Sequence, residues 1–146
     1  MNSHQAALLT KLINLKNCVE RIENKKPFTI QQLTSDFDLQ DVVSLNMQRA
    51  IQICVDIAAL IIAESNNRPP ETMSSSFIIL NSLGALPKEI EHALVKAVGM
   101  RNILVHEYTE INWTTVYRVT TEHMNVFKDF MTAILKYAKI DLDKVN

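Results

Sequence analysis

Residues 42–63 read VVSLNMQRAIQICVDIAALIIA and hold the strongest structural signal in the chain. Apolar residues recur there every three or four positions, which is the spacing of an amphipathic helix. One stripe is formed by Val43, Met47, Ala50, Cys54, Ala58 and Ile61, and it is widened by Ile53, Ile57 and Leu60. The pattern predicts a helix from residue 38 or 41 to about residue 65. A face this wide indicates a central helix with neighbours on more than one side.

Helical patterns also lie on both sides of this stretch. On the amino-terminal side, Ser3 can cap a helix that ends near residue 24, and the connector 28–38 has room for one helical turn. On the carboxyl-terminal side, a short helix over about 75–82 is stopped by Gly84. Pro87 suits the first turn of the next helix, and Asn112 can cap a last one that continues to about residue 139.

The composition agrees with an all-α protein of one domain. The chain has 146 residues, of which only two are glycine and four are proline, so it has little material for the turns of an all-β fold. Because the connections between the helical patterns are short, neighbouring helices are expected to be antiparallel. We therefore predict a single domain over 1–146 that is an up-down antiparallel bundle of four to five helices.

Charge and cysteine content limit the classes of function. A formal net charge of −1 gives no overall basic field for nucleic acid, so any such contact has to be local. Cys18 and Cys54 lie in apolar helical patterns, where we interpret them as buried free thiols in a reducing compartment. The first residues lack the pattern of a signal peptide, and the apolar run 53–63 is interrupted by Asp56 and too short to span a bilayer. A cytoplasmic protein without a membrane contact is expected.

The sharpest chemical signal is Arg101-Asn102-Ile103-Leu104-Val105-His106-Glu107-Tyr108. Histidine transfers protons near neutral pH, and the guanidinium of arginine forks onto phosphate oxygens, so the pair suits phosphodiester chemistry. At about 100° per residue, however, Arg101 and His106 are separated by about 140° around one straight helix, whereas Tyr108 falls close to Arg101. Two copies of the motif facing each other across a dimer would complete a site more easily than one.

This motif, with its RN-x3-H-x-Y spacing, resembles the R-x4-6-H signature of HEPN-domain ribonucleases. Its short form is similar to that of the HepT toxins of bacterial HepT–MntA toxin–antitoxin pairs. Three further segments fall where members of that branch carry similar residues: 48–58, 76–80 and 98–100. The likeness therefore covers most of the chain in order and spacing.

The resemblance implies a HEPN-like helical homodimer that cleaves RNA without a metal ion or other cofactor; DNA is not expected as a substrate. His106 would act as general base or acid toward a ribose 2′-OH and the leaving oxygen. Arg101 would hold the scissile phosphate, and Asn102 would orient either that phosphate or the imidazole. The expected products are a 2′,3′-cyclic phosphate and a 5′-hydroxyl.

The same resemblance gives Tyr108 a regulatory role. It matches the tyrosine that a nucleotidyltransferase antitoxin modifies with AMP in such pairs. A bulky anion beside the cleft would repel RNA and occupy the phosphate site of Arg101, as a phosphate group would. The implied partners are therefore RNA, a second copy of the chain and a nucleotidyltransferase.

Other readings of these residues stay open. Arg101 and His106 can be a surface pair with a favourable place at a helix carboxyl end. The domain can also be a non-catalytic helical partner of a nucleotidyltransferase, or an interaction module whose motif packs a dimer seam. The polar stripe formed by Arg49, Gln52 and Asp56 is an exposed or dimer-rim face, or else Asp56 pairs with Arg101 or orients His106.

The remaining chemical candidates give weaker signals. Glu110 stands where an HExxH zinc motif would need its second histidine, so no metal site is expected. His123 is expected to be half-buried, and Gly99 to allow close packing. Isolated basic residues are usually only solvated, but three of them could extend an RNA-binding surface: Lys88, Lys96 and Arg118.

Overall fold

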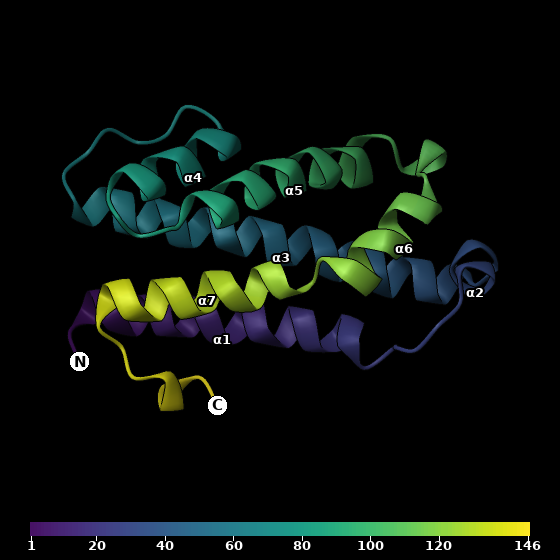
Figure 1. Cartoon of the computed structure of the whole chain (residues 1–146), viewed down its shortest axis with the longest axis horizontal. Coiled ribbons are helices and arrows are strands. Elements are labelled where there is room, and N and C mark those ends of the chain that lie inside the picture. Colours follow the sequence, from purple (N-terminus) through teal and green to yellow (C-terminus); the bar gives the residue numbers. More distant parts are fainter.

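The computed structural model describes the backbone of the whole chain and every side chain except that of Tyr108. The fold is all-α, as predicted (Figure 1). Its α-helices are α1 (Ser3–Glu23), α2 (Ile30–Ser35), α3 (Phe37–Glu64), α4 (Met73–Ser82), α5 (Lys88–His106), α6 (Trp113–Glu122) and α7 (Asn125–Ala138). Two short 3-10 helices complete it: η1 (Tyr108–Glu110) and η2 (Leu142–Lys144).

Helix α3 is the centre of the bundle, which confirms the prediction made from its wide apolar face. It packs against α1, α2, α4 and α5. Figure 1 shows α1, α3, α5 and α7 alternating in direction, so the long helices form the expected up-down arrangement. The interior side of α3 is closed by residues that are almost completely buried: Val43, Met47, Ala50, Ile51, Cys54, Ile57, Ala58, Ile61 and Ile62.

Side chains at the helix ends explain where the helices begin and stop. Asn2, not Ser3, caps α1: its Oδ1 accepts from the Gln5 amide at 2.8 Å, and the Gln5 side chain accepts from the Asn2 amide at 3.1 Å. This reciprocal pair satisfies two free amides at once, which one serine at position 3 would not do. Pro87 lies just before α5 and not inside its first turn. Gly84 ends the α4 region with φ +80°, a conformation that favours glycine.

The predicted last helix over 112–139 is wrong in one respect, because it breaks between α6 and α7. His123 leaves the helical conformation with φ −125° and ψ 8°. Just before the break, the hydroxyls of Thr120 and Thr121 both donate to the Tyr117 carbonyl, at 2.8 and 2.9 Å, and so compete with the backbone ladder. The two pieces also have different partners, since α6 packs on α2 whereas α7 packs on α1 and α5.

Helix α3 is long and apolar enough to cross a membrane by length and composition alone. Half of its most apolar window is nevertheless buried inside the bundle. The central helix of a packed bundle meets the same two criteria, so these properties follow from its position in the core.

Candidate functional site

Helix α5 carries the Arg101–His106 motif at its carboxyl end. Leu104 is 2% exposed and anchors this end in the core. Arg101 is half-buried, whereas Asn102 and His106 are exposed. Helix α5 ends at His106, and Tyr108 belongs to η1. The sequence analysis had placed Tyr108 on the same straight helix as Arg101, which is wrong. The side chain of Tyr108 lies outside the described residues.

Arg101 reaches across to α3, where it meets Gln52. Its Nη2 donates to Gln52 Oε1 at 3.3 Å, and its Nη1 donates to Asn102 Oδ1 at 3.4 Å. Gln52 in turn donates from Nε2 to Asp56 Oδ1 at 3.0 Å. Both Gln52 and Asp56 are half-buried on the surface of α3. The structure therefore links four polar side chains in a row: Asp56, Gln52, Arg101 and Asn102.

Asp56 does not contact Arg101 in the way the sequence suggested. The ion pairs found among the described side chains do not include one between these two residues, because Gln52 stands between them. His106 takes part in none of the side-chain hydrogen bonds of the described residues. The arrangement thus connects Asp56 to the guanidinium, through an amide, and leaves the imidazole open to solvent.

The charge of Arg101 is held without a neutralising partner among the described residues. Both of its acceptors among the described residues are amide oxygens, which are neutral. Its Nε is buried and has no hydrogen-bond partner in the described part of the chain. A buried donor without a partner is rare in proteins and marks positions where another requirement outweighs stability. Arg101 is such a position, and its half-buried guanidinium bonds to neutral amide oxygens among the described residues.

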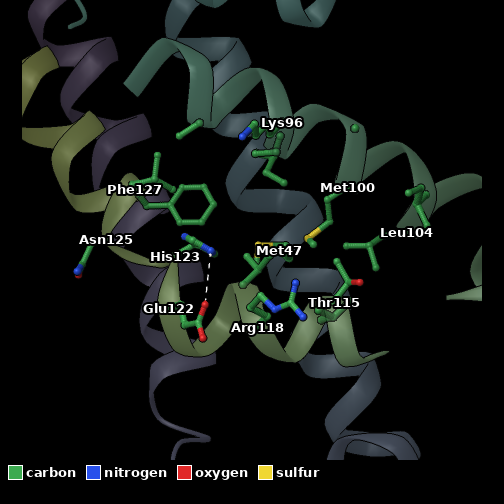
Figure 2. Close-up of a pocket in the computed structure, with 18 of the residues that line it drawn as sticks. Met47, Lys96, Met100, Leu104, Thr115, Arg118, Glu122, His123, Asn125 and Phe127 are labelled. Carbon is green, nitrogen blue, oxygen red and sulfur yellow. Dashed lines mark ion pairs between the residues drawn. The ribbon is translucent and has the colours of Figure 1, made fainter. Parts of the chain in front are cut away.

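A groove of about 880 Å³ lies on another side of α5, between that helix and the pair α6 and α7. Figure 2 shows Met47 of α3 in its floor, with Met100 and Leu104 on the α5 wall and Phe127 opposite. Arg118 reaches over it from α6. Neither Arg101, Asn102 nor His106 is among the described residues that line it.

The groove also shows where three expectations from sequence fall. Lys96 and Arg118, two of the three basic residues that could extend an RNA-binding surface, line this groove, whereas Arg101 does not. His123 is 61% exposed and lies 3.8 Å from Glu122, so the expectation of a half-buried histidine is wrong. Gly99 is exposed, and a Cβ added to it would meet nothing within 4 Å. Close packing therefore does not explain this glycine.

The described side chains offer little for thiol or metal chemistry. Cys54 is fully buried, and burial together with the nearby Asp56 carboxylate raises the pKa of its thiol. Burial also raises the pKa of Cys18, although Arg21 and Arg49 oppose that shift. Both cysteines are free, as predicted. Within the described residues, no three His, Cys, Asp or Glu side chains gather as metal ligands would.

Sequence reasoning missed the importance of Gln52. It placed this residue in a polar stripe with Arg49 and Asp56 but gave it no role. The hydrogen bond to Arg101 joins residues 49 positions apart, so it depends on how α3 and α5 pack. The i, i+4 spacing of Gln52 and Asp56, which puts both on one helix face, was the signal within the sequence.

Comparisons with known proteins place this chain beside bacterial nucleases. A family model described as "Ribonuclease HepT-like" matches residues 15–134. The chain is 34% identical over 127 residues to "mRNA nuclease HepT" of Shewanella oneidensis, covering 87% of this chain and 95% of that protein. It is 22% identical over 145 residues to "tRNA nuclease HepT" of Aphanizomenon flos-aquae, covering 99% and 98%. 

A solved structure gives the same result at the level of the fold. The tri-AMPylated Shewanella oneidensis HEPN toxin, in complex with its MNT antitoxin, superposes with a TM-score of 0.83 at 33% identity. The alignment covers 93% of this chain and 99% of that one. The fold, the order of helices and the length of the domain are therefore shared along almost the whole chain.

Proposed function

Because the chain belongs to the HepT-like ribonuclease family, we propose that it is a metal-independent endoribonuclease toxin restrained by a nucleotidyltransferase antitoxin. One observation carries the proposal: a half-buried Arg101, without a neutralising partner among the described residues, lies five positions before an exposed His106 at the end of the same helix. A docking module needs neither feature. The family relatives named as mRNA and tRNA nucleases support RNA as the substrate class.

The two side chains divide the chemistry between them. His106 removes the proton of a ribose 2′-OH and delivers a proton to the leaving 5′-oxygen, which breaks the phosphodiester bond and leaves a 2′,3′-cyclic phosphate. Arg101 binds the phosphate and stabilises the negative charge that builds on its oxygens. Asn102 orients either the phosphate or the imidazole, and its Oδ1 also accepts a hydrogen bond from Arg101 Nη1 at 3.4 Å.

The active unit that we propose is a homodimer. Arg101 turns toward α3 and binds Gln52, whereas His106 is exposed at the helix end and makes no hydrogen bond with Arg101 in the described structure. A second copy facing the first would bring two such pairs to one cleft. The exposed positions of Asn102 and His106 support this arrangement.

We further propose that Tyr108 is the site of regulation. A solved relative of this family is tri-AMPylated and bound to an MNT antitoxin. Tyr108 follows His106 by two residues, at the start of η1. AMP groups attached there would add negative charge beside Arg101 and exclude the phosphates of RNA.

The nuclease proposal is tested with two histidines on one helix. His106→Ala and His92→Ala remove the same side chain from exposed positions of α5, and the His92 side chain is 64% exposed. Each protein is expressed without an antitoxin, and growth and RNA cleavage are measured in the presence of a chelator. We expect His106→Ala to lose toxicity and cleavage by about 10²–10⁴-fold and His92→Ala to retain both. Equal behaviour of wild type and His106→Ala, both folded and dimeric, would favour the alternative of a non-catalytic partner.

The regulatory proposal has its own test. The chain is co-expressed with its nucleotidyltransferase, and AMP is located by mass spectrometry in wild type, Tyr108→Phe and Tyr137→Phe. Tyr137 is 40% exposed and serves as an accessible control. We expect AMP on Tyr108 in wild type and Tyr137→Phe, and loss of both AMP and protection from toxicity in Tyr108→Phe. AMP found only on other residues contradicts the assignment.

A further inference from the structure

We propose that Gln52 is a positioning residue for Arg101, and that Asp56 acts through it by fixing which end of the Gln52 amide faces the guanidinium. This inference deepens the proposed ribonuclease function and names residues on α3 that the R-x4-H motif does not contain. It starts from the two hydrogen bonds that connect α3 to α5: Asp56 to Gln52 at 3.0 Å and Gln52 to Arg101 at 3.3 Å.

The order of donors and acceptors in this row is forced. A guanidinium only donates, and an ionised carboxylate only accepts. Gln52, between them, can offer either its oxygen or its NH2 group to each neighbour. Only one orientation satisfies both: Nε2 toward Asp56 and Oε1 toward Arg101, as the structure has it. In the reverse orientation, N–H would face N–H at Arg101 and oxygen would face oxygen at Asp56. Asp56 therefore locks the amide.

Arg101 needs such a fixed acceptor because the rest of its environment does not hold it. Its Nε is buried without a partner in the described part of the chain, which is unfavourable for this position of the side chain. The bond to Asn102 is long, at 3.4 Å, and comes from the adjacent residue on the same helix. Gln52 supplies the one described contact that ties the guanidinium to another helix. Without it, solvent outside the bundle is the better environment for the charge.

An amide is also the right chemical group for this task. A glutamate at position 52 would bind the guanidinium more strongly, by a charge-assisted bond, but would cancel the charge that a phosphate needs. A glutamine holds the geometry and leaves the positive charge in place. The negative charge of Asp56 stays one residue further away. Asp56 thus orients the Gln52 amide, and Gln52 contacts the guanidinium without adding a charge.

The first experiment measures the position of Arg101 directly, whether or not the chain cleaves RNA. In ¹⁵N-labelled full-length protein, a guanidinium held by Gln52 rotates slowly and gives separate Nη signals. We expect these signals to merge in Gln52→Ala and to stay separate in Gln48→Ala. Gln48 is a matched control, because it lies one turn earlier on α3 and binds Ser44 at 3.0 Å. Separate signals in Gln52→Ala, as in wild type, would overturn the proposal.

The second experiment separates positioning from packing. Gln52→Glu is made together with Asp56→Asn, so that the asparagine NH2 group donates to the new carboxylate and no oxygen faces an oxygen. This exchange is nearly isosteric, so a residue with only a structural role would tolerate it. We expect this variant to keep its melting temperature and separate Nη signals, but to bind a labelled single-stranded RNA less tightly in a non-cleaving His106→Ala background. The slope of log K against log salt should fall by about 0.7, the value of one lost phosphate contact. An unchanged slope contradicts the neutral-contact argument.

Cleavage then links positioning to the reaction. We expect Gln52→Ala to lower kcat about 100-fold, because a small displacement of a group that stabilises the transition state has effects of this size. Asp56→Ala should have a smaller effect of the same kind, and Asp56→Asn should restore most of it, since the asparagine oxygen still accepts from Gln52. Should wild type not cleave RNA, the nuclease proposal fails, while the NMR result still decides the role of Gln52.

Discussion

The two sides of helix α5 differ in shape and in chemistry. The motif side is defined by Arg101 and Asn102, with His106 exposed at the helix end; it has a row of polar contacts to α3, and Arg101 has no neutralising partner among the described residues. The groove side encloses about 880 Å³ and is walled largely by apolar residues, including Met100, Leu104 and Phe127. The groove therefore lies away from Arg101, Asn102 and His106, the residues that we propose for the chemistry.

The site that we propose to be shared between two subunits would not need a deep motif side on either one. In the proposed dimer, the second copy supplies the opposite wall, so one subunit presents only half a cleft. The groove is completed by one chain alone, from α3, α5, α6 and α7. Variants on the two sides should thus affect different measurements, and the following predictions are ordered from the largest expected effect to the smallest.

Replacing the arginine on each side gives the sharpest contrast. We expect Arg101→Ala to lower the rate of RNA cleavage by about 10²–10³-fold, because the transition state loses its main donor to the phosphate oxygens. Arg118→Ala, on the groove rim, should change the rate by less than about threefold. Single-turnover cleavage of a labelled RNA measures both. Similar losses in the two variants would mean that RNA also uses the groove.

Stability should depend on the groove side instead. Phe127 is 1% exposed and lines the groove from α7, so Phe127→Ala should lower the free energy of unfolding by about 3–5 kcal/mol. Ile103→Ala is the control for burial within the groove, since Ile103 also lines it but is 44% exposed and should lose much less. Urea denaturation followed by circular dichroism gives both values. A loss below about 1 kcal/mol for Phe127→Ala would show that this wall is loosely packed.

The amino end of α6, which forms one wall of the groove, is capped by one residue, Asn112. The Asn112 side chain accepts from the Thr115 amide at 3.2 Å, so Asn112→Ala should cost about 1 kcal/mol. Asn125 also lines the groove but caps no helix, and Asn125→Ala should change stability less. Thermal unfolding of the two variants makes the comparison. Equal shifts of the melting temperature in the two variants would show that loss of the helix cap does not cause the destabilisation of Asn112→Ala.

The rim charges should contribute least. His123 Nε2 lies 3.8 Å from Glu122 Oε2, and both side chains are more than half exposed. Exposed pairs of this kind contribute little to stability, so Glu122→Gln should stay within about 0.5 kcal/mol of wild type and should cleave RNA at the same rate. The measurement is chemical denaturation at low and at physiological salt. A large, salt-dependent change in the free energy of unfolding would contradict this prediction and indicate that the charged residues on the rim stabilise the fold.

Sequence analysis predicted the bundle because its strongest signal is local. The apolar stripe from Val43 to Ile61 follows from 3.6-residue periodicity, and its width correctly identified α3 as the central helix. The break at His123 was missed, because the apolar pattern continues across it without interruption. The chain bends there since α6 and α7 pack on different helices, and periodicity within one segment contains no information about partners.

The site divides in the same way. Arg101 and His106 are five positions apart, so spacing and helix geometry could relate them, and the family likeness assigned their roles. Gln52 touches Arg101 across 49 positions, and only the packing of α3 on α5 brings them together. The groove was not predicted at all. A sequence shows which face of each helix is apolar, but it does not show where two apolar faces fail to pack fully and leave a groove between them.

The break between α6 and α7 also affects which part of the molecule unfolds locally. Helix α6 has ten residues, too few to be stable alone, and its main helical neighbour is the six-residue α2. Because the ladder of backbone bonds is interrupted at His123, loss of α6 does not have to propagate into α7, which stays packed on α1 and α5. Amide protons of α6 are therefore expected to exchange with solvent by local unfolding, well before those of α3. We therefore expect local unfolding of α6 at one end of the bundle, while α3, which carries Gln52, remains folded.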